Sequence, residues 1–176
     1  QGNPILPDGT LIRDAVSSID QITDEYFTKP FRSVQLPIIP RNIDKAIGAN
    51  GKPVIIKKNI FEKNAKTHQF TPAESRRILK EALYNTDLVG RTQPKKRPNH
   101  WVAIKVDEES PITVLEVNEN KDNVEVVGWY RLDDRNLERI KRQAEREGGE
   151  LLILTPKGAA ASLSTLPLNS SSVGKD

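Results

Sequence analysis

The sequence predicts an α+β fold, in which a four- to five-stranded antiparallel meander sheet has helices packed on one face. Three apolar or alternating runs, at residues 100–107, 111–118 and 124–130, follow one another with only short turns between them. Strands joined this closely pair as antiparallel neighbours. Residues 72–85 and 134–147 instead repeat their apolar positions with helical spacing. This arrangement leaves the other face of the sheet partly open for a ligand.

Local signals define the remaining elements. Thr71 is a candidate N-cap, Pro72 stands at the first helical position, and Glu74 completes a capping box. Gly128, inside a strand, predicts a β-bulge or a close approach of another backbone segment. The other predicted elements are a helix at 41–48, a strand at 53–58, an irregular turn at 59–66, a strand at 87–92 and an apolar, central strand at 150–155.

The chain divides into an N-terminal extension or connector at 1–36, a compact α+β domain at 37–156 and a poorly ordered tail at 157–176. It contains no methionine, and we expect it to be a piece of a longer protein. It also contains no cysteine, which excludes disulfides and thiolate metal sites. No apolar stretch approaches the length of a membrane span, so we expect no membrane partner.

The charge is distributed unevenly along the chain. The segment from Arg41 to Lys105 has 15 Lys or Arg and 5 Asp or Glu, a formal charge of +10. Residues 1–40 sum to −2 and residues 106–176 to −5. A strongly basic segment between acidic flanks indicates a polyanion as the first candidate partner.

His68 follows a lysine-rich turn and precedes the predicted helix at 72–85. At a helix N-terminus, backbone N–H groups and the helix dipole favour an anion and keep an imidazole neutral, as a general base requires. The alternative is a histidine that only caps or packs the loop. Lys58, Lys63 and Lys66 lie close by in the sequence and are candidate phosphate contacts.

His100 and Trp101 begin a strand soon after the basic run Lys95-Lys96-Arg97. His100 is a candidate second acid–base group, and Trp101 a candidate stacking platform for a base. For Trp101 we favour the alternative, a place in the core. The basic run would neutralise phosphates, although runs of charge are more often only solvated.

Arg91 and Thr92 end the predicted strand before this basic run. A guanidinium and a hydroxyl could hold a phosphate and stabilise a pentavalent phosphorane; an exposed strand end is an equal alternative. Tyr130 offers a phenol at a strand end, and here too a simple core aromatic is an alternative. The charged helix at 134–147 is interpreted as a solvated face without function.

Several catalytic motifs are absent from the sequence. It has no phosphate-binding glycine loop, no HExxH or GxSxG motif and no zinc-ligand spacing, and acidic residues do not cluster in the basic segment. The remaining inventory of His, Lys, Arg, Thr and Tyr suits chemistry without a metal. Cleavage of RNA by its own 2′-hydroxyl requires one group that takes a proton, one that donates a proton, and cations that stabilise the phosphorane.

The order of elements resembles a known group. An apolar strand, a Lys/Asn-rich turn ending in His68, a helix and the meander HWVAIKVD, PITVLEVNEN, VEVVGWY resemble nuclease domains of the barnase–EndoU–colicin–RelE-like superfamily over residues 36–156. That superfamily includes domains of Mu-F-type phage head proteins and of large polyvalent proteins of mobile elements. The resemblance implies metal-independent ribonuclease activity at matching positions: Lys63, His68, Arg91, Thr92, His100, Asn118 and Tyr130. The sequence lacks a sheet glutamate flanked by arginines; Glu116 is the nearest candidate, so an inactive copy stays an alternative.

Our hypothesis is therefore a metal-independent endoribonuclease domain, of toxin or effector type, from a larger mobile-element protein. The alternatives are a non-catalytic nucleic-acid- or protein-binding module using the same basic face, and a structural accessory domain. We expect RNA or another nucleic acid and an immunity protein as partners, no cofactor, and a cytoplasmic location. The predicted catalytic residues are His68, His100, Lys63, Arg91 and Thr92. The predicted substrate-binding residues are Lys58, Lys66, Lys95, Lys96, Arg97, Trp101, Asn118 and Tyr130.

Overall fold

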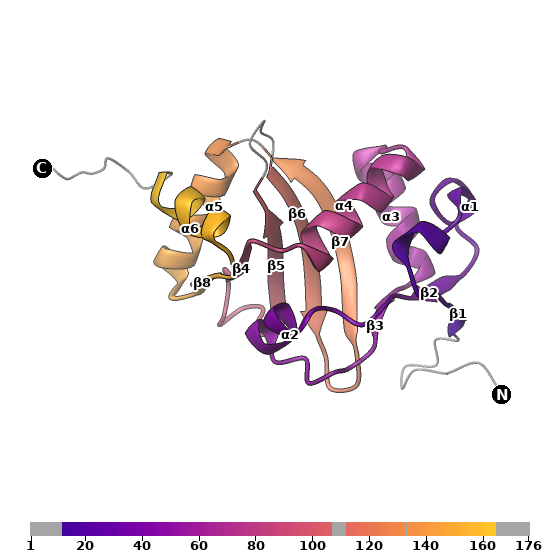
Figure 1. The fold of residues 1–176 in the computed structure, drawn as a ribbon, viewed down its shortest axis with the longest axis horizontal. Coiled ribbons are helices and arrows are strands. Elements are labelled where there is room, and N and C mark those ends of the chain that lie inside the picture. The colour runs from indigo at the N-terminus through magenta and orange to yellow at the C-terminus, as the bar shows by residue number, and fades with distance from the viewer. Residues whose placement is uncertain (1–11, 107–111, 133, 165–176) are drawn as a thin grey trace, which may run out of the picture.

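The computed structural model describes residues 12–106, 112–132 and 134–164 (Figure 1). Two groups of elements precede and follow a central meander. The first group is β1 (Ile12–Ala15), η1 (Ile19–Gln21), α1 (Asp24–Thr28), β2 (Ser33–Gln35), α2 (Arg41–Ile47), β3 (Val54–Ile56), α3 (Lys58–His68) and α4 (Pro72–Tyr84). The meander is β4 (Leu88–Arg91), β5 (His100–Lys105), β6 (Ile112–Glu119) and β7 (Val124–Leu132). The second group is α5 (Asp134–Glu147), β8 (Glu150–Ile153) and α6 (Pro156–Ser164).

These strands form one eight-stranded sheet in the order β1-β2-β3-β7-β6-β5-β4-β8. The four strands of the meander are antiparallel neighbours, whereas β1 pairs with β2, and β3 with β7, in parallel. The predicted fold class, a four- to five-stranded antiparallel sheet, is therefore wrong. The β1 and β2 strands have only four and three residues, which is too short for alternation to identify them in the sequence. The β3 strand lies within the predicted strand at 53–58, but no local pattern indicates its parallel pairing with β7.

Helices lie on both faces of the sheet, not on one face as predicted. Along β5, Trp101 and Ala103 belong to a large core that includes the apolar side of α4. Val102 and Ile104 point the other way, into a smaller core with Leu137 of α5. Successive residues of a strand face opposite sides of a sheet, so a strand buried on both faces becomes continuously apolar.

Several local predictions are confirmed. The Thr71 side chain accepts a hydrogen bond from the backbone N–H of Glu74, and the Glu74 side chain accepts one from Thr71, which is the predicted capping box of α4. The predicted helix at 41–48 is α2, which ends at Gly48 in the left-handed conformation, with φ 71°. The register between β6 and β7 shifts after Glu116, which places a bulge beside Gly128.

Other local predictions are wrong. Residues 58–68 form a full helix, α3, where we predicted an irregular turn, because Ile60, Phe61 and Asn64 make one buried side with helical spacing. The β8 strand lies at an edge of the sheet, not in its centre, since it pairs with β4 alone. The α5 and α6 helices cover β8 only in part, and Ile153 of this apolar strand is 51% exposed.

The large core continues across the predicted boundary at residue 36. Ile22, Phe27 and Val34 are buried in the same cluster as the apolar residues of α4. At the other end, residues 156–164 form α6, within the predicted tail. The first 11 residues, the connection at 107–111, Asp133 and residues 165–176 lie outside the described residues.

Candidate functional site

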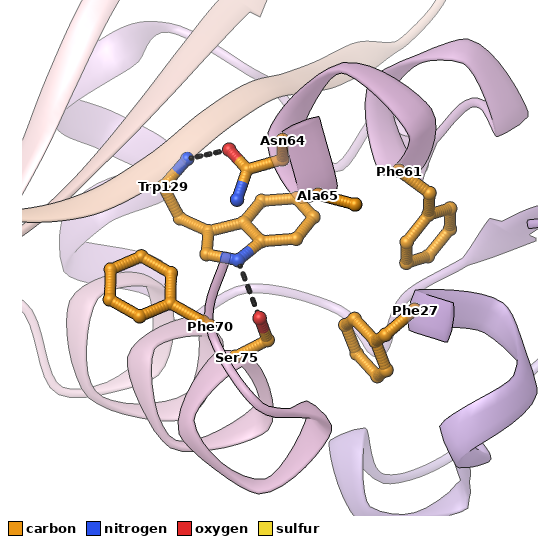
Figure 2. Close-up of a pocket in the computed structure, with 7 residues that line it drawn as sticks. All are labelled: Phe27, Phe61, Asn64, Ala65, Phe70, Ser75 and Trp129. Carbon is orange, nitrogen blue, oxygen red and sulfur yellow. Dashed lines mark hydrogen bonds between the residues drawn. The ribbon is translucent and has the colours of Figure 1, made fainter. Parts of the chain in front are cut away.

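The α3 helix covers a part of β7 that has no neighbouring strand. The short β3 pairs only with Val124 and Glu125, so the next residues of β7 need another hydrogen-bond partner on that side. Asn64 of α3 supplies it: its Oδ1 accepts the backbone N–H of Trp129 at 3.0 Å (Figure 2). The Trp129 indole N–H donates to Ser75 Oγ of α4, also at 3.0 Å. The first hydrogen bond holds α3 beside β7, four residues before His68, and the second holds α4 against the same tryptophan.

Glu116 lies at the centre of a polar cluster on the opposite face of the sheet from α4. The register places His100 opposite Asn118 and Val102 opposite Glu116, so His100, Glu116 and Asn118 share one face. Glu116 Oε1 lies 3.0 Å from His100 Nε2, and Glu116 Oε2 accepts the Tyr130 hydroxyl at 2.6 Å. Nδ1 of His100 lies 3.0 Å from Asn118 Oδ1. The carboxylate thus links a buried histidine to a tyrosine.

A pocket opens between this cluster and α3. Gly128 lies opposite Glu116 in the register, so no side chain fills the space beside the carboxylate. The His68 ring stacks on the Tyr130 ring, with centroids 5.5 Å apart, and forms another wall. We call this the His68 pocket; its lining is Lys63, Asn64, Thr67, His68, Glu116, Val127, Gly128 and Tyr130.

Two further pockets share residues of the same cluster. The α5 pocket lies between α5 and the sheet and is lined by Thr92, Gln93, Arg97, His100, Val102, Glu116, Tyr130, Ile140 and Gln143. The asparagine pocket is lined by Arg97, Pro98, Asn99, His100, Asn118 and Asn120. Because His100 lines both and Glu116 lines the α5 and His68 pockets, the three hollows surround one polar centre.

The environment changes the proton affinities of this cluster. Burial raises the pKa of Glu116, but hydrogen bonds from His100 and Tyr130, with the charges of His100 and Arg97, outweigh it and hold that pKa below the usual value. Partial desolvation of the ring, which stacks on Tyr130, lowers the pKa of His68 although the residue is exposed; Glu116 opposes this effect and Lys63 adds to it. Burial and the adjacent Glu116 carboxylate raise the pKa of Tyr130. Glu116 is therefore ionised, and Tyr130 keeps its proton, at neutral pH.

The structure brings together most of the predicted site residues. Lys63, His68 and Tyr130 line the His68 pocket, and Thr92, Arg97 and His100 line the α5 pocket. Asn118 lines the asparagine pocket. Lys58, Lys66, Lys95 and Lys96 are exposed and lie outside these three pockets.

Arg91 and Trp101 lie on the other face of the sheet. Trp101 is 6% exposed and belongs to the large core, so the core interpretation holds for it. The Arg91 guanidinium carbon lies 4.7 Å from the centroid of the Trp101 ring, and Arg91 Nη1 donates a hydrogen bond to the Pro98 carbonyl oxygen. The sheet therefore separates Arg91 from His68 and Glu116.

The local context of His68 differs from the predicted one. His68 is the last residue of α3, not a loop residue at the N-terminus of α4. A helix C-terminus favours a cation, so the predicted dipole effect does not apply. The pKa of His68 is lowered all the same, through burial first, with Lys63 adding to the effect.

Among the lining residues that were not predicted as site residues, Glu116, Gln93 and Gln143 bear most on the chemistry of the pockets. Glu116 was considered only as a distant match, but its position two residues before Asn118 on one strand was a usable signal for a shared face. Gln93 and Gln143 line the α5 pocket. Gln143 lies on the helix that we interpreted as a solvated face, and no sequence pattern distinguishes it from the other polar residues there.

Much of the basic segment is paired with carboxylates. Seven of its 15 Lys and Arg residues form ion pairs: Lys52–Glu119, Lys57–Glu125, Arg76–Asp24, Arg77–Glu81, Lys80–Asp20, Arg91–Glu150 and Lys105–Asp87. Within the described residues, the other eight have no carboxylate partner. These eight are Arg41, Lys45, Lys58, Lys63, Lys66, Lys95, Lys96 and Arg97.

Within residues 12–106, 112–132 and 134–164, no group of three or more His, Asp or Glu side chains could hold a metal ion. None of the helices in that part of the chain has the length and apolar character that crossing a bilayer requires.

Comparison with known proteins identifies the family. The model of large polyvalent protein-associated domain 13 matches residues 7–144, which is most of the chain. The chain belongs to this family. No curated protein and no solved structure matches it. Membership of large polyvalent protein-associated domain 13 supports the mobile-element part of the resemblance, and the match begins well before residue 36, within the predicted extension.

Proposed function

We propose that this polyvalent-protein-associated domain is a metal-independent endoribonuclease whose acid–base pair is Glu116 and His68. One observation carries the proposal: a carboxylate and an imidazole line the same pocket, together with the cation of Lys63. Arg97 adds a second cation near Glu116, from the rim of the α5 pocket. A pair of titratable groups beside unpaired cations is what cleavage of RNA by its own 2′-hydroxyl requires.

In the proposed reaction, Glu116 takes the proton of a ribose 2′-hydroxyl, and the 2′ oxygen attacks the adjacent phosphorus. The bond from phosphorus to the 5′ oxygen breaks, and protonated His68 gives that oxygen its proton. The products are a 2′,3′-cyclic phosphate and a 5′-hydroxyl. Glu116 suits the acceptor role because it is ionised, and a carboxylate that accepts two hydrogen bonds still has free lone pairs. Lys63 and Arg97 stabilise the phosphorane.

His100 has a positioning role in this scheme, not the direct role that we predicted. It is only 6% exposed, and its ring nitrogens face Glu116 Oε1 and Asn118 Oδ1, both at 3.0 Å. A histidine held in this way fixes the carboxylate and favours its charged form. His68 is exposed, and within the described part of the chain its ring nitrogens have no hydrogen-bond partner, which suits exchange of protons with a substrate.

The test measures cleavage of a fluorescent RNA in EDTA by the wild type, Glu116→Gln and His68→Gln. We expect each substitution to lower the rate by about 10²- to 10⁴-fold, the usual contribution of one acid or base. Glu62→Gln removes a carboxylate from the exposed side of α3, outside the His68 pocket, and should keep the wild-type rate. Thermal unfolding of each variant checks that the fold is intact.

If the folded wild type did not cleave RNA, the proposed endoribonuclease activity would be refuted. If that protein still bound RNA, the alternative of a non-catalytic module using the same basic surface would stand. Cleavage that Glu116→Gln and His68→Gln leave unchanged would refute this site. RNA as substrate further implies action in a cytoplasm and, for a toxin-type domain, an immunity protein as partner.

A further inference from the structure

The α5 pocket contains polar side chains that the protein does not satisfy. Among the described residues, the side-chain amides of Gln93 and Gln143 have no hydrogen-bond partner, although both residues are partly buried. The hydroxyl of Thr92, a residue only 8% exposed, has none either. Solvent reaches the polar atoms of these three side chains, so they are accessible to a ligand. Three groups with unused donors and acceptors thus converge on one pocket, where a ligand can replace the water that they would otherwise bind.

The chemistry of the lining indicates which kind of ligand this is. Val102 and Ile140 give the pocket an apolar surface, whereas Gln93 and Gln143 provide neutral groups that both donate and accept. A phosphate would call for cations, and here a cation, Arg97, is only one member of the lining. An apolar surface combined with uncharged amides fits a flat, neutral heterocycle with donors and acceptors at its edge. A nucleobase has these properties, and carboxamides are established partners of base edges.

The position of the pocket relates it to the proposed reaction centre. The α5 pocket and the His68 pocket share Glu116 and Tyr130, so they lie on two sides of the same pair of residues. We propose that the α5 pocket is a base-recognition subsite, in which Gln93 and Gln143 read the edge of a base next to the cleaved phosphate. This inference rests on the proposed function for its substrate, but it concerns binding and not proton transfer.

The test therefore measures binding without cleavage. The probes are 2′-fluoro uridine hexanucleotides, which lack the attacking hydroxyl, with A, C, G or U at the two central positions. Fluorescence anisotropy gives the dissociation constant of each probe for the wild type, Gln93→Met and Gln143→Met. Methionine keeps the length of the side chain and removes the amide, so the fold should be preserved. Gln35→Met, on β2 at the far side of β3 and β7, is the matched control.

We expect the wild type to prefer one base by about tenfold or more, the scale of a good amide–base pair. Each Met variant should reduce that preference to less than about threefold, with Gln35→Met unchanged. A wild type without base preference, or a preference that survives both substitutions, would overturn the subsite. The two proposals can fail separately. Base-selective binding without RNA cleavage would refute only the nuclease activity. RNA cleavage, with a base preference that the Met variants keep, would refute only the base-recognition subsite.

Discussion

Addition of one methyl group at residue 128 should separate folding from activity. A Cβ atom built on Gly128 meets only Asn64 Oδ1, at 3.7 Å, which is an ordinary contact. Its φ is outside the left-handed region, so alanine causes no backbone strain. The same methyl would enter the His68 pocket beside Glu116, where the register places Gly128. Gly128→Ala therefore changes the pocket and leaves the fold almost unaffected.

Gly128→Ala should change thermal stability and the rate of RNA cleavage in opposite directions. Alanine in a strand is more favourable than glycine by about 0.5–1 kcal/mol. For a domain of this size, 1 kcal/mol corresponds to about 2–4 °C, so Tm should stay equal or rise by about that amount. The rate of RNA cleavage should fall by about 10²-fold, because a displacement of about 1 Å at the reacting groups can cost this much. Differential scanning calorimetry and the EDTA cleavage assay measure the two quantities.

Gly149→Ala provides the contrast. A Cβ there would lie 1.9 Å from the Arg91 carbonyl oxygen, so the backbone must move, and we expect a loss of about 1–3 kcal/mol. Gly128→Ala that lowers Tm as much as Gly149→Ala would show that the space beside Asn64 is not as described. Gly128→Ala with wild-type cleavage would show that RNA does not react in the His68 pocket.

Two further predictions concern pH and the support of β7. Cleavage requires ionised Glu116 and protonated His68, and both pKa values are lowered from their ordinary values of 4.5 and 6.5; the rate should fall below the Glu116 pKa and above the His68 pKa, giving a bell-shaped pH profile with its maximum below about 6. A rate that rises with pH through neutrality would instead make His68 the base. Ser75→Ala should cost about 1–3 kcal/mol in urea unfolding, because it leaves the indole N–H of Trp129, a residue 1% exposed, without its acceptor. Trp129→Phe in the Ser75→Ala background should show a smaller cost than in the wild type, and strictly additive costs would contradict this explanation.

Local patterns predicted the centre of the fold and failed at its margins. The meander strands β5, β6 and β7 have 6, 8 and 9 residues and form apolar or alternating runs, and α4 begins at a capping box, so these elements were identified from the sequence. The α3 helix has no side-chain cap from its own N-cap residue and a polar composition. Contacts with distant segments stabilise it: Ile60 and Phe61 pack against α1 and β7, and Asn64 accepts the Trp129 N–H. The β1–β2 pair depends on contacts with distant segments, which no window of sequence contains.

Strand alternation explains which of the predicted site residues line the pockets. Arg91 and Thr92 are neighbours at a strand end, so they face opposite sides, and only Thr92 reaches the α5 pocket. Alternation also separates His100 from Trp101 on β5 and Trp129 from Tyr130 on β7. The two tryptophans belong to the large core, and His100 and Tyr130 line the α5 pocket. The prediction treated the first two pairs as joint candidates, although alternation alone allows one member of each.

The charge asymmetry has a different meaning in the folded chain than in the sequence. Five of the seven carboxylates that pair with the basic segment come from the acidic flanks, so folding neutralises much of the +10 charge. Of the eight cations left without a carboxylate, six are ones that we had assigned to phosphate, including Lys63 and Arg97. Arg91, the predicted cation that lies on the other face of the sheet, is paired with Glu150. Cations kept free while their neighbours pair are the ones available to a polyanion, and this supports nucleic-acid binding independently of the acid–base pair.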